Sequence, residues 1–206
     1  KNIIIKNKKK NNLSILDHGC AAGEWLHYLD KEIKNSDFTG VDYSQQLINL
    51  AKKLNFHSSF KFVKKKSENF VTKKKFDVIN VSGLISYYDN PNSIIKNCSQ
   101  QLSKNGLLII FDNFNQFNVD VIVRYKDNFR SKTFNKGWNI HSEKTIKKLC
   151  KNAGLKFKKS YNFKLSFDLK KTTDPTRSWV IKTNEGKMFR NGLAQIYSLN
   201  ALTFIK

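Results

Sequence analysis

The sequence predicts an α/β fold in which helices cover both faces of a mostly parallel sheet. Short apolar segments of strand length alternate with amphipathic segments of helical period along most of the 206 residues. One segment, residues 107–111, is an unbroken apolar run, which is typical of a strand buried on both faces. Strands and helices that alternate at this spacing form parallel sheets. Each helix runs back to the N-terminal end of the preceding strand, so the next strand runs in the same direction.

The first half of the chain is expected to form four strands and three helices. The strands are residues 13–17, 38–42, 60–63 and 76–81. Apolar residues at helical spacing begin at Trp25 and continue to about Lys34. Ser44 is a suitable N-cap for the second helix, because its hydroxyl can accept a hydrogen bond from the first turn. The third helix covers about residues 92–102, with Pro91 near its first turn.

The alternation continues to Gly154 and then changes. Residues 104–106 form a turn ahead of the strand 107–111, and Ser142 is expected to cap a helix that Gly154 ends. Residues 155–163 then alternate between apolar and polar side chains, which predicts a strand.

The C-terminal quarter predicts an added β-hairpin. Residues 178–183 and 187–190 flank the turn Asn184-Glu-Gly186, and the insertion is placed at residues 168–192. An insertion of this size is too small to be a second domain. A last apolar segment, residues 199–205, is expected to return to the edge of the sheet.

The composition agrees with one folded domain over residues 1–206. Hydrophobic residues make up 39% of the chain and aromatic residues 13%, which is enough to bury a core. Cys20, Cys98 and Cys150 form neither a zinc pattern nor a disulfide framework, so no metal site is expected and a cytoplasmic location is predicted. No apolar run is long enough to span a bilayer, and the basic segment 1–10 lacks the apolar region of a signal peptide.

The net charge of +22 raises the question of a nucleic-acid partner. It arises from 38 Lys and Arg against 16 Asp and Glu, and a basic surface attracts phosphate backbones. However, 34 of the basic residues are Lys, whereas phosphate and base recognition favour Arg for its two-pronged hydrogen bonding. A nucleic-acid partner is therefore not favoured, and we interpret the excess of Lys and Asn as a coding bias.

The turn after the first strand carries the most chemical information. Within Leu16-Asp-His-Gly-Cys-Ala-Ala-Gly-Glu-Trp-Leu26, Asp17 ends the strand, and Gly19 and Gly23 lie in the turn that opens the helix. Glycine lets backbone N–H groups approach a ligand closely, and a helix N-terminus attracts anionic groups. Asp42 ends the second strand, where a carboxylate can accept hydrogen bonds from both ribose hydroxyls. These features predict a nucleoside-containing ligand across the carboxyl ends of the strands.

Four motifs of the chain occur in an order and spacing that a known family shares. They are Leu-Asp-x-Gly-Cys-x-x-Gly from Leu16, Gly40-Val-Asp-Tyr-Ser44, Lys75-Phe-Asp-Val-Ile-Asn-Val-Ser-Gly83 and Leu102-Ser-Lys-Asn-Gly-Leu-Leu-Ile-Ile110. Together they resemble the class I S-adenosylmethionine-dependent methyltransferases over residues 13–112 and, more weakly, up to Gly154. The resemblance implies a Rossmann-like, doubly wound sheet of seven strands with the last one antiparallel, for which residues 199–205 are the candidate. It also implies S-adenosylmethionine as the cofactor and S-adenosylhomocysteine as the product.

The resemblance assigns the cofactor to the loops after the first four strands. The positions concerned are Asp17, Gly19, Cys20, Ala21, Gly23, Asp42, Tyr43, Ser67, Glu68, Val81 and Ser82. The first five are expected around the methionine part, Asp42 at the ribose, Tyr43 against the adenine, and the last two beside the sulfonium. The chain departs from the family pattern in two places: Ala21 replaces a common glycine, and Lys66 or Ser67 replaces an acid near the adenine. A dinucleotide-binding domain is the alternative, but its Gly-x-Gly-x-x-Gly motif would require glycine at position 21.

Candidate catalytic residues follow the later strands. Methyl transfer depends mainly on positioning, although an alcohol acceptor also needs a base and an ionised phosphate oxygen does not. Tyr87, Asp112 and His141 are the candidates. His141 has the most suitable ordinary pKa for a base, but a residue just before a helix N-cap is usually a surface residue.

Residues 113–141 are expected to form a lid over the acceptor. Their aromatic and cationic side chains are Phe114, Phe117, Arg124, Tyr125, Phe129 and Arg130. This mixture suits a sugar or a phosphorylated group. Tyr88 and Arg124 are candidate acceptor contacts, and Arg177 of the hairpin insertion is a candidate anion clamp.

The sequence favours a small-molecule acceptor over a nucleic-acid base. After the fourth strand it reads Asn80-Val-Ser-Gly83, without the Pro-Pro-aromatic segment on which base N-methyltransferases stack a flipped base. Asp174-Pro-Thr-Arg-Ser-Trp179 and its hairpin resemble, more loosely, methyltransferases of bacterial capsule and surface-polysaccharide biosynthesis. That resemblance implies O-methylation of a sugar hydroxyl or of a phosphate or phosphoramidate group. An RNA methyltransferase and a non-catalytic cofactor-binding subunit are the alternatives.

Overall fold

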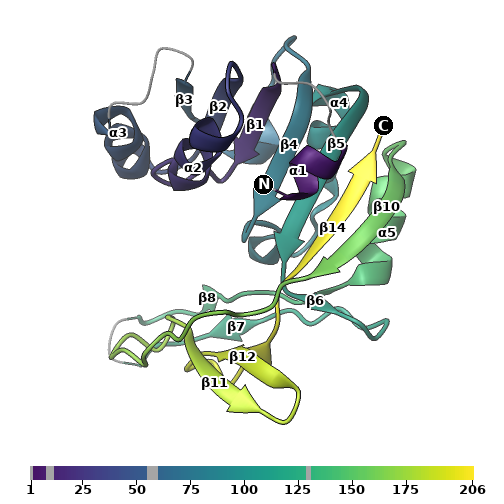
Figure 1. Ribbon diagram of the computed structural model, residues 1–206. Coiled ribbons are helices and arrows are strands. Elements are labelled where there is room, and N and C mark those ends of the chain that lie inside the picture. Colours follow the sequence, from purple (N-terminus) through teal and green to yellow (C-terminus); the bar gives the residue numbers. More distant parts are fainter. Residues whose placement is uncertain (1, 8–11, 55–59, 129–130) are drawn as a thin grey trace.

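A seven-stranded mixed sheet forms the centre of the molecule (Figure 1). The computed structural model describes residues 2–7, 12–54, 60–128 and 131–206. The strands of this sheet, in spatial order, are β10 (Lys156–Asn162), β14 (Asn200–Ile205), β5 (Leu102–Asp112), β4 (Phe76–Ser82), β1 (Ser14–His18), β2 (Asp37–Asp42) and β3 (Phe60–Lys64). β14 is antiparallel to both of its neighbours, and the other pairs are parallel. The predicted fold class is thereby confirmed.

The last strand does not lie where the sequence placed it. β14 pairs with β5 on one side and with β10 on the other, so it is an interior strand and β10 forms the edge. The prediction of a return to the edge was wrong, because β10 and β14 form an antiparallel pair that joins the sheet through β14.

Helices cover both faces of the sheet, as expected from the alternation. They are α1 (Asn2–Asn7), α2 (Glu24–Glu32), α3 (Gln45–Lys53), α4 (Asn92–Gln101) and α5 (Glu143–Asn152), with two short 3-10 helices, η1 (Ser67–Asn69) and η2 (Ile85–Tyr87). Ser44 accepts a hydrogen bond from the Leu47 N–H and Ser142 accepts one from the Thr145 N–H, which confirms both predicted N-caps. Gly154 follows α5 with φ of 80°, a left-handed conformation that suits glycine.

Two separate apolar clusters fill the space between the sheet and its helices. One cluster contains residues of α4 and α5, such as Ile94 and Ile146, and the other contains residues of α1 and α2, such as Ile4 and Leu26. Strand β4 contributes to both clusters, because consecutive side chains of a strand point to opposite faces.

Short strands form a smaller body beyond the carboxyl ends of β1, β4 and β5 (Figure 1). They are β6 (Phe114–Asn115), β7 (Arg124–Tyr125), β8 (Asn135–Lys136), β9 (His141–Ser142), β11 (Trp179–Thr183), β12 (Gly186–Arg190) and β13 (Ile196–Tyr197). β11 and β12 form the predicted hairpin. β13 adds a third strand to it, so this sheet extends beyond the expected end at residue 192. Within the described ranges, no helix has the length and apolar character that a membrane span requires.

Candidate functional site

The loop between β1 and α2 adopts a conformation that requires positive φ at three positions. Gly19 has φ of 74°, Ala21 of 48° and Gly23 of 82°. Glycine reaches these values without strain, whereas alanine does so at a cost. The N–H groups of Gly19 and Cys20 both donate to the Val41 carbonyl, at 2.8 and 3.1 Å, so the loop is fixed against the end of β2.

Asp42 joins the loops that follow β1 and β2. Its Oδ2 accepts a hydrogen bond from the Ala21 N–H at 3.1 Å, and its Oδ1 accepts one from the Ser44 N–H at 2.8 Å. The side chain is buried apart from the part that lines a cavity. Each carboxylate oxygen has a further lone pair, so Asp42 keeps the capacity to accept hydrogen bonds from a ligand.

Asp17 is held in a buried hydrogen-bonded chain at the carboxyl ends of β1 and β4. Its Oδ1 accepts a bond from the Asn80 Nδ2 at 2.7 Å, and the Ser82 hydroxyl donates to the Asn80 Oδ1 at 3.1 Å. Burial raises the pKa of Asp17 to about 7; the Asn80 bond opposes this rise, and the nearby carboxylate of Asp42 adds to it. Asn80 is a site residue that the sequence did not predict.

Two adjoining cavities lie along these loops. The first cavity, of ≈ 540 Å³, is lined by Gly19, Asp42, Tyr43, Leu47, Lys66, Ser67, Glu68, Ser82, Gly83, Leu84, Tyr87, Tyr88 and Lys136. The second cavity, of ≈ 510 Å³, is lined by Ile3, Asp17, Gly19, Cys20, Ala21, Glu24, Trp25, Asn80, Ser82, Ile109, Phe111, Phe163 and Ala201. They share Gly19 and Ser82, so together they form one elongated site. Of the eleven predicted cofactor positions, nine line it, whereas Gly23 and Val81 line neither cavity.

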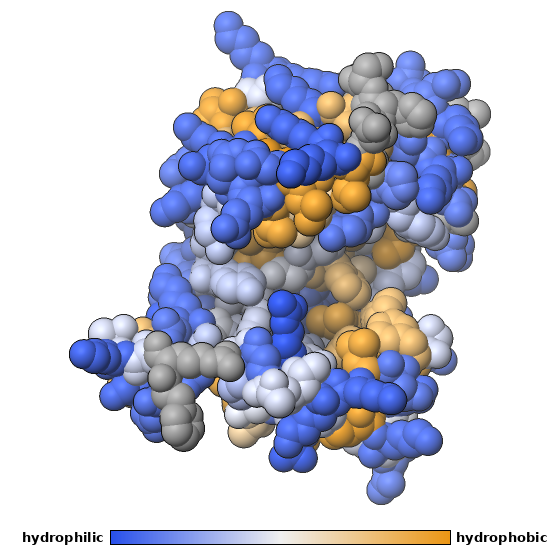
Figure 2. Space-filling model, turned by 90° about the vertical axis from the view of Figure 1, so that its left-hand side faces the viewer, coloured by the Kyte–Doolittle hydropathy of each residue, from blue (hydrophilic) through white to orange (hydrophobic). Residues whose placement is uncertain are grey.

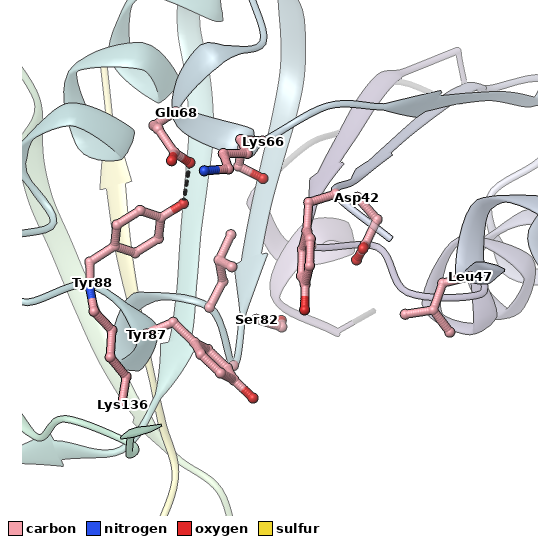
Figure 3. Close-up of a pocket in the computed structure, with 13 residues that line it drawn as sticks. Asp42, Leu47, Lys66, Glu68, Ser82, Tyr87, Tyr88 and Lys136 are labelled. Atoms are coloured by element: carbon pink, nitrogen blue, oxygen red, sulfur yellow. Dashed lines mark hydrogen bonds between the residues drawn. The ribbon is translucent and has the colours of Figure 1, made fainter. Parts of the chain in front are cut away.

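Figure 3 shows how the walls of the first cavity are arranged. Asp42 and Leu47 lie on one side, and Tyr87, Tyr88 and Lys136 lie on the other. The Tyr88 hydroxyl donates to the Glu68 Oε2 at 2.6 Å, which fixes both side chains. Burial and this bond to Glu68 raise the pKa of Tyr88.

A third cavity adjoins the first one. It has ≈ 310 Å³ and is lined by Tyr87, Tyr125, Lys136, Trp138, Asp174, Thr176 and Arg177. It shares Tyr87 and Lys136 with the first cavity. The rings of Tyr87 and Trp138 meet edge to face at 6.1 Å between centroids, and burial raises the pKa of Tyr87. Arg177, predicted as an anion clamp, lies here.

The first cavity lies between the large sheet and the smaller body, because residues of both line it. The third cavity is lined by Tyr87 of η2 and by residues of the smaller body. Figure 2 shows that this side of the molecule is hollowed between the two parts. The site is therefore an open groove across the carboxyl ends of the strands.

Two of the predicted catalytic side chains lie outside this groove. His141 is buried, and its Nε2 lies 2.8 Å from the Tyr88 carbonyl, where an N–H can donate. The carboxylate of Asp112 is also buried, and it accepts hydrogen bonds from the Ser86 and Asn113 N–H groups. Burial raises the pKa of Asp112 to about 6. Both residues brace the segment that carries Tyr87, which itself lies between the first and third cavities.

The predicted lid contributes less to the groove than expected. Arg124 pairs with Asp89 at 2.6 Å and does not line the first, second or third cavity. Phe117 is 79% exposed. Phe129 and Arg130 lie outside the described residues. The lid residues that do reach the groove are Tyr125, Lys136 and Trp138, of which the sequence singled out Tyr125.

A family model described as "Methyltransferase domain" matches residues 4–159. A curated relative, the malonyl-[acyl-carrier protein] O-methyltransferase of Haemophilus influenzae, is 30% identical over 97 residues, which cover 47% of this chain and 36% of that protein. The chain therefore spans little more than a third of the length of this relative.

Solved structures share the fold at low sequence identity. An S-adenosylmethionine-dependent methyltransferase structure from Methanosarcina mazei has a TM-score of 0.68 at 15% identity, covering 100% of this chain and 97% of its own. One from Clostridium acetobutylicum has a TM-score of 0.64 at 15% identity, covering 99% and 87%. An O-methyltransferase of Brevibacillus brevis in complex with S-adenosylhomocysteine has a TM-score of 0.62 at 15% identity, covering 78% and 52%.

Proposed function

Because the chain belongs to the methyltransferase domain family, whose model matches residues 4–159, we propose that it transfers a methyl group from S-adenosylmethionine to a small acceptor. The observation that carries this proposal is the placement of Asp42. Its carboxylate lies at the end of β2, on the wall of a cavity, and is held by N–H groups of two loops. A carboxylate in this place suits the hydroxyl pair of a ribose.

The groove offers a suitable partner for each part of the cofactor. Asp17 and the loop from Gly19 to Gly23 would hold the methionine part, and Tyr43, which is 72% exposed, would lie against the adenine with Ser67 and Glu68 at its edge. Ser82, which lines both cavities, would lie beside the sulfonium. When bound, S-adenosylmethionine supplies a methyl group on a positively charged sulfur. The residues of the chain bind and orient it.

For the acceptor we propose a small polar or anionic molecule that is methylated on oxygen. The third cavity, with Tyr87 at its junction with the first, supports this proposal. A sugar hydroxyl, or the phosphate or phosphoramidate group of a capsule or surface-glycan precursor, suits its rings and cations. His141 and Asp112 then act as positioning residues that brace Tyr87, rather than as bases. The Haemophilus relative is named for a different O-acceptor, malonyl-[acyl-carrier protein].

Calorimetry with S-adenosylhomocysteine tests the cofactor part of the proposal. The wild-type chain is expected to bind it, and Asp42→Ala is expected to weaken binding by about tenfold or more, because a hydrogen bond to a charged group contributes about 1.5–3 kcal/mol. Asp37→Ala is the matched control, because Asp37 lies on the same strand at the opposite end and pairs with Lys74 at the surface. Absence of binding to the folded wild-type chain would refute the proposal.

The basic charge keeps an RNA substrate as the second candidate. If the chain neutralises RNA phosphates, its affinity for RNA falls steeply as salt is raised. A flat salt response, or no RNA binding, removes this candidate. A non-catalytic role is separated by turnover, since such a subunit binds S-adenosylhomocysteine but forms none from S-adenosylmethionine with any acceptor.

A further inference from the structure

The third cavity leads to the place where methyl transfer is proposed. It meets the first cavity at Tyr87 and Lys136, and the first cavity includes Ser82, beside which the sulfonium is proposed. A molecule in the third cavity can therefore approach the methyl group past the Tyr87 ring. This cavity is the natural acceptor site.

The charges on its walls are not balanced. Lys136 and Arg177 are cationic, and Asp174 is the acid among the described residues that line the cavity. Asp174 accepts hydrogen bonds from the Thr176 N–H at 2.9 Å and from its hydroxyl at 2.7 Å, and its other oxygen lies 3.9 Å from the Arg177 Nε. One net positive charge remains, so a bound monoanion would bring the walls to neutrality.

Lys136 keeps much of its charge available to a ligand. It lies 3.7 Å from the Asp89 Oδ2, but the same oxygen lies 2.6 Å from Arg124, which satisfies it at closer range. The Lys136 side chain is 59% exposed, so it can turn toward a ligand at little cost. The adjacent sulfonium of the proposed cofactor adds another positive charge to the same space.

The side chains suited to act as bases are committed elsewhere. Asp112 and His141 do not line the cavity and are bonded to backbone groups. Burial raises the pKa of Tyr87, which keeps its hydroxyl protonated near neutral pH. Asp174, the acid that does line the cavity, is engaged by Thr176 and lies beside Arg177. An acceptor that brings its own negative charge needs none of them.

We propose, resting on the function proposed above, that the acceptor is an acid whose ionised oxygen receives the methyl group, held between Lys136 and Arg177 against the rings of Tyr87 and Trp138. A phosphate monoester and a carboxylate share this chemistry, whereas a neutral sugar hydroxyl does not. In the transfer, the oxygen-to-methyl bond forms as the sulfur-to-methyl bond breaks, and the electron pair of the broken bond stays on sulfur. The acceptor loses one unit of negative charge as the sulfur loses its positive charge, and no proton is released.

Binding to the chain saturated with S-adenosylhomocysteine gives the first test. Glucose 1-phosphate and glucuronate serve as anionic probes, and glucose serves as the neutral probe. At least one anion is expected to bind about tenfold more tightly than glucose, and Arg177→Met or Lys136→Met is expected to reduce this preference by about two- to fivefold, the range of exposed charge pairs. Lys182→Met is the matched control, because Lys182 is an exposed lysine of β11 in the same smaller body and lines none of the cavities described here. If neither anion binds more tightly than glucose, the proposal is overturned.

Proton release gives the second test. In weak buffer with a pH indicator, transfer to an ionised oxygen releases no proton for each S-adenosylhomocysteine formed, whereas transfer to a hydroxyl releases one. One proton released for each S-adenosylhomocysteine formed would show a hydroxyl acceptor instead and would overturn the proposal. Failure of the wild-type chain to bind S-adenosylhomocysteine would refute the methyltransferase proposal itself, so the two failures are distinguishable.

Discussion

Ala21 occupies a left-handed backbone position in the loop that follows β1, with φ of 48°. This conformation costs an L-residue about 1–2 kcal/mol, and glycine loses about 0.4–1 kcal/mol more than alanine through the entropy of the unfolded chain. The net prediction is that Ala21→Gly raises the free energy of unfolding by about 0.5–1 kcal/mol.

Urea denaturation measures this change. Ala22→Gly is the control, because Ala22 is buried beside it without a positive φ, so glycine there brings the entropic loss without relief of strain. Equal destabilisation by the two substitutions would show that position 21 is not strained.

The raised pKa of Asp17 predicts how cofactor binding depends on pH. Its pKa of about 7 in the free protein means that the carboxylate is largely protonated below that pH. Asp17 is proposed to hold the methionine part, whose ammonium group favours the ionised carboxylate. The affinity for S-adenosylhomocysteine is therefore expected to fall as the pH drops below 7, with a limiting slope of about tenfold for each pH unit. Calorimetry at pH 6, 7 and 8 checks this, and Asp17→Asn should bind weakly with no such slope.

The same group affects stability with the opposite sign. The folded-state pKa of Asp17 lies above its ordinary value of 3.8, so the folded chain binds the proton more tightly than the unfolded chain does. Without ligand, the contribution of Asp17 to stability is therefore greatest below about pH 4 and is lost as the pH rises toward 7. The difference between wild type and Asp17→Asn across this range isolates it from the other titrating groups.

At the scale of elements, the segment between β4 and α4 is held by the part of the chain that leads to α5. The Tyr88 carbonyl accepts hydrogen bonds from Asn139 at 3.0 Å and from the His141 ring at 2.8 Å, and Asn139 N–H donates to the Ser86 carbonyl. These contacts fix the backbone on either side of Tyr87. The position of a cavity wall thus depends on residues that do not line the groove.

His141→Leu is expected to lower turnover by about tenfold, which corresponds to the loss of one buried hydrogen bond of about 1–1.5 kcal/mol. Its affinity for S-adenosylhomocysteine should be unchanged within error, and the shape of its pH–rate profile should match that of the wild type. Loss of a limb of the pH–rate profile in the variant would instead identify His141 as a base.

The sequence predicted those parts of the site that depend on local patterns. Gly19 and Asp42, which line the first cavity, were singled out because a turn and a strand end can be identified from a few adjacent residues. Lys136 and Trp138 were missed as wall residues because they reach the groove only through pairings of short strands far along the chain. No periodicity in their own segment indicates such a contact.

The same distinction holds for whole elements. Helices α2 to α5 were predicted from local signals such as amphipathic spacing and N-caps, whereas α1 was not predicted. The order of β10, β14 and β5 depends on which strand the chain returns to, and the sequence of residues 199–205 contains no signal that separates an interior place from an edge. β13 is only two residues long, which is too short for a periodic pattern to predict a strand.

At the scale of the whole molecule, the net charge of +22 is a weaker guide to the binding partner than the charged residues of a single cavity are. The excess of lysine is spread over the chain, whereas the proposed acceptor site depends on two cations and one acid in a single cavity. The two proposed roles therefore belong to different bodies. The large sheet carries the residues proposed to bind the cofactor, and the smaller body completes the wall of the proposed acceptor site.

This division predicts that part of the smaller body can be removed without loss of the cofactor site. β10 and β14 pair up to Asn162 and Asn200, and the Phe163 N–H still donates to the Leu199 carbonyl at 2.9 Å. Replacing residues 164–198 by Asn-Gly would therefore close this pair with a two-residue turn of the type that favours hairpins. The shortened chain is expected to bind S-adenosylhomocysteine with an affinity within about twofold of wild type, since the residues proposed to hold it are all retained.

The shortened chain should lose acceptor turnover, because Asp174, Thr176 and Arg177 are absent and the Gln195 bond that holds the Trp138 carbonyl is broken. If the shortened chain instead folds, by circular dichroism and thermal unfolding, and keeps full turnover, the acceptor site must lie elsewhere, with the second cavity next to be tested.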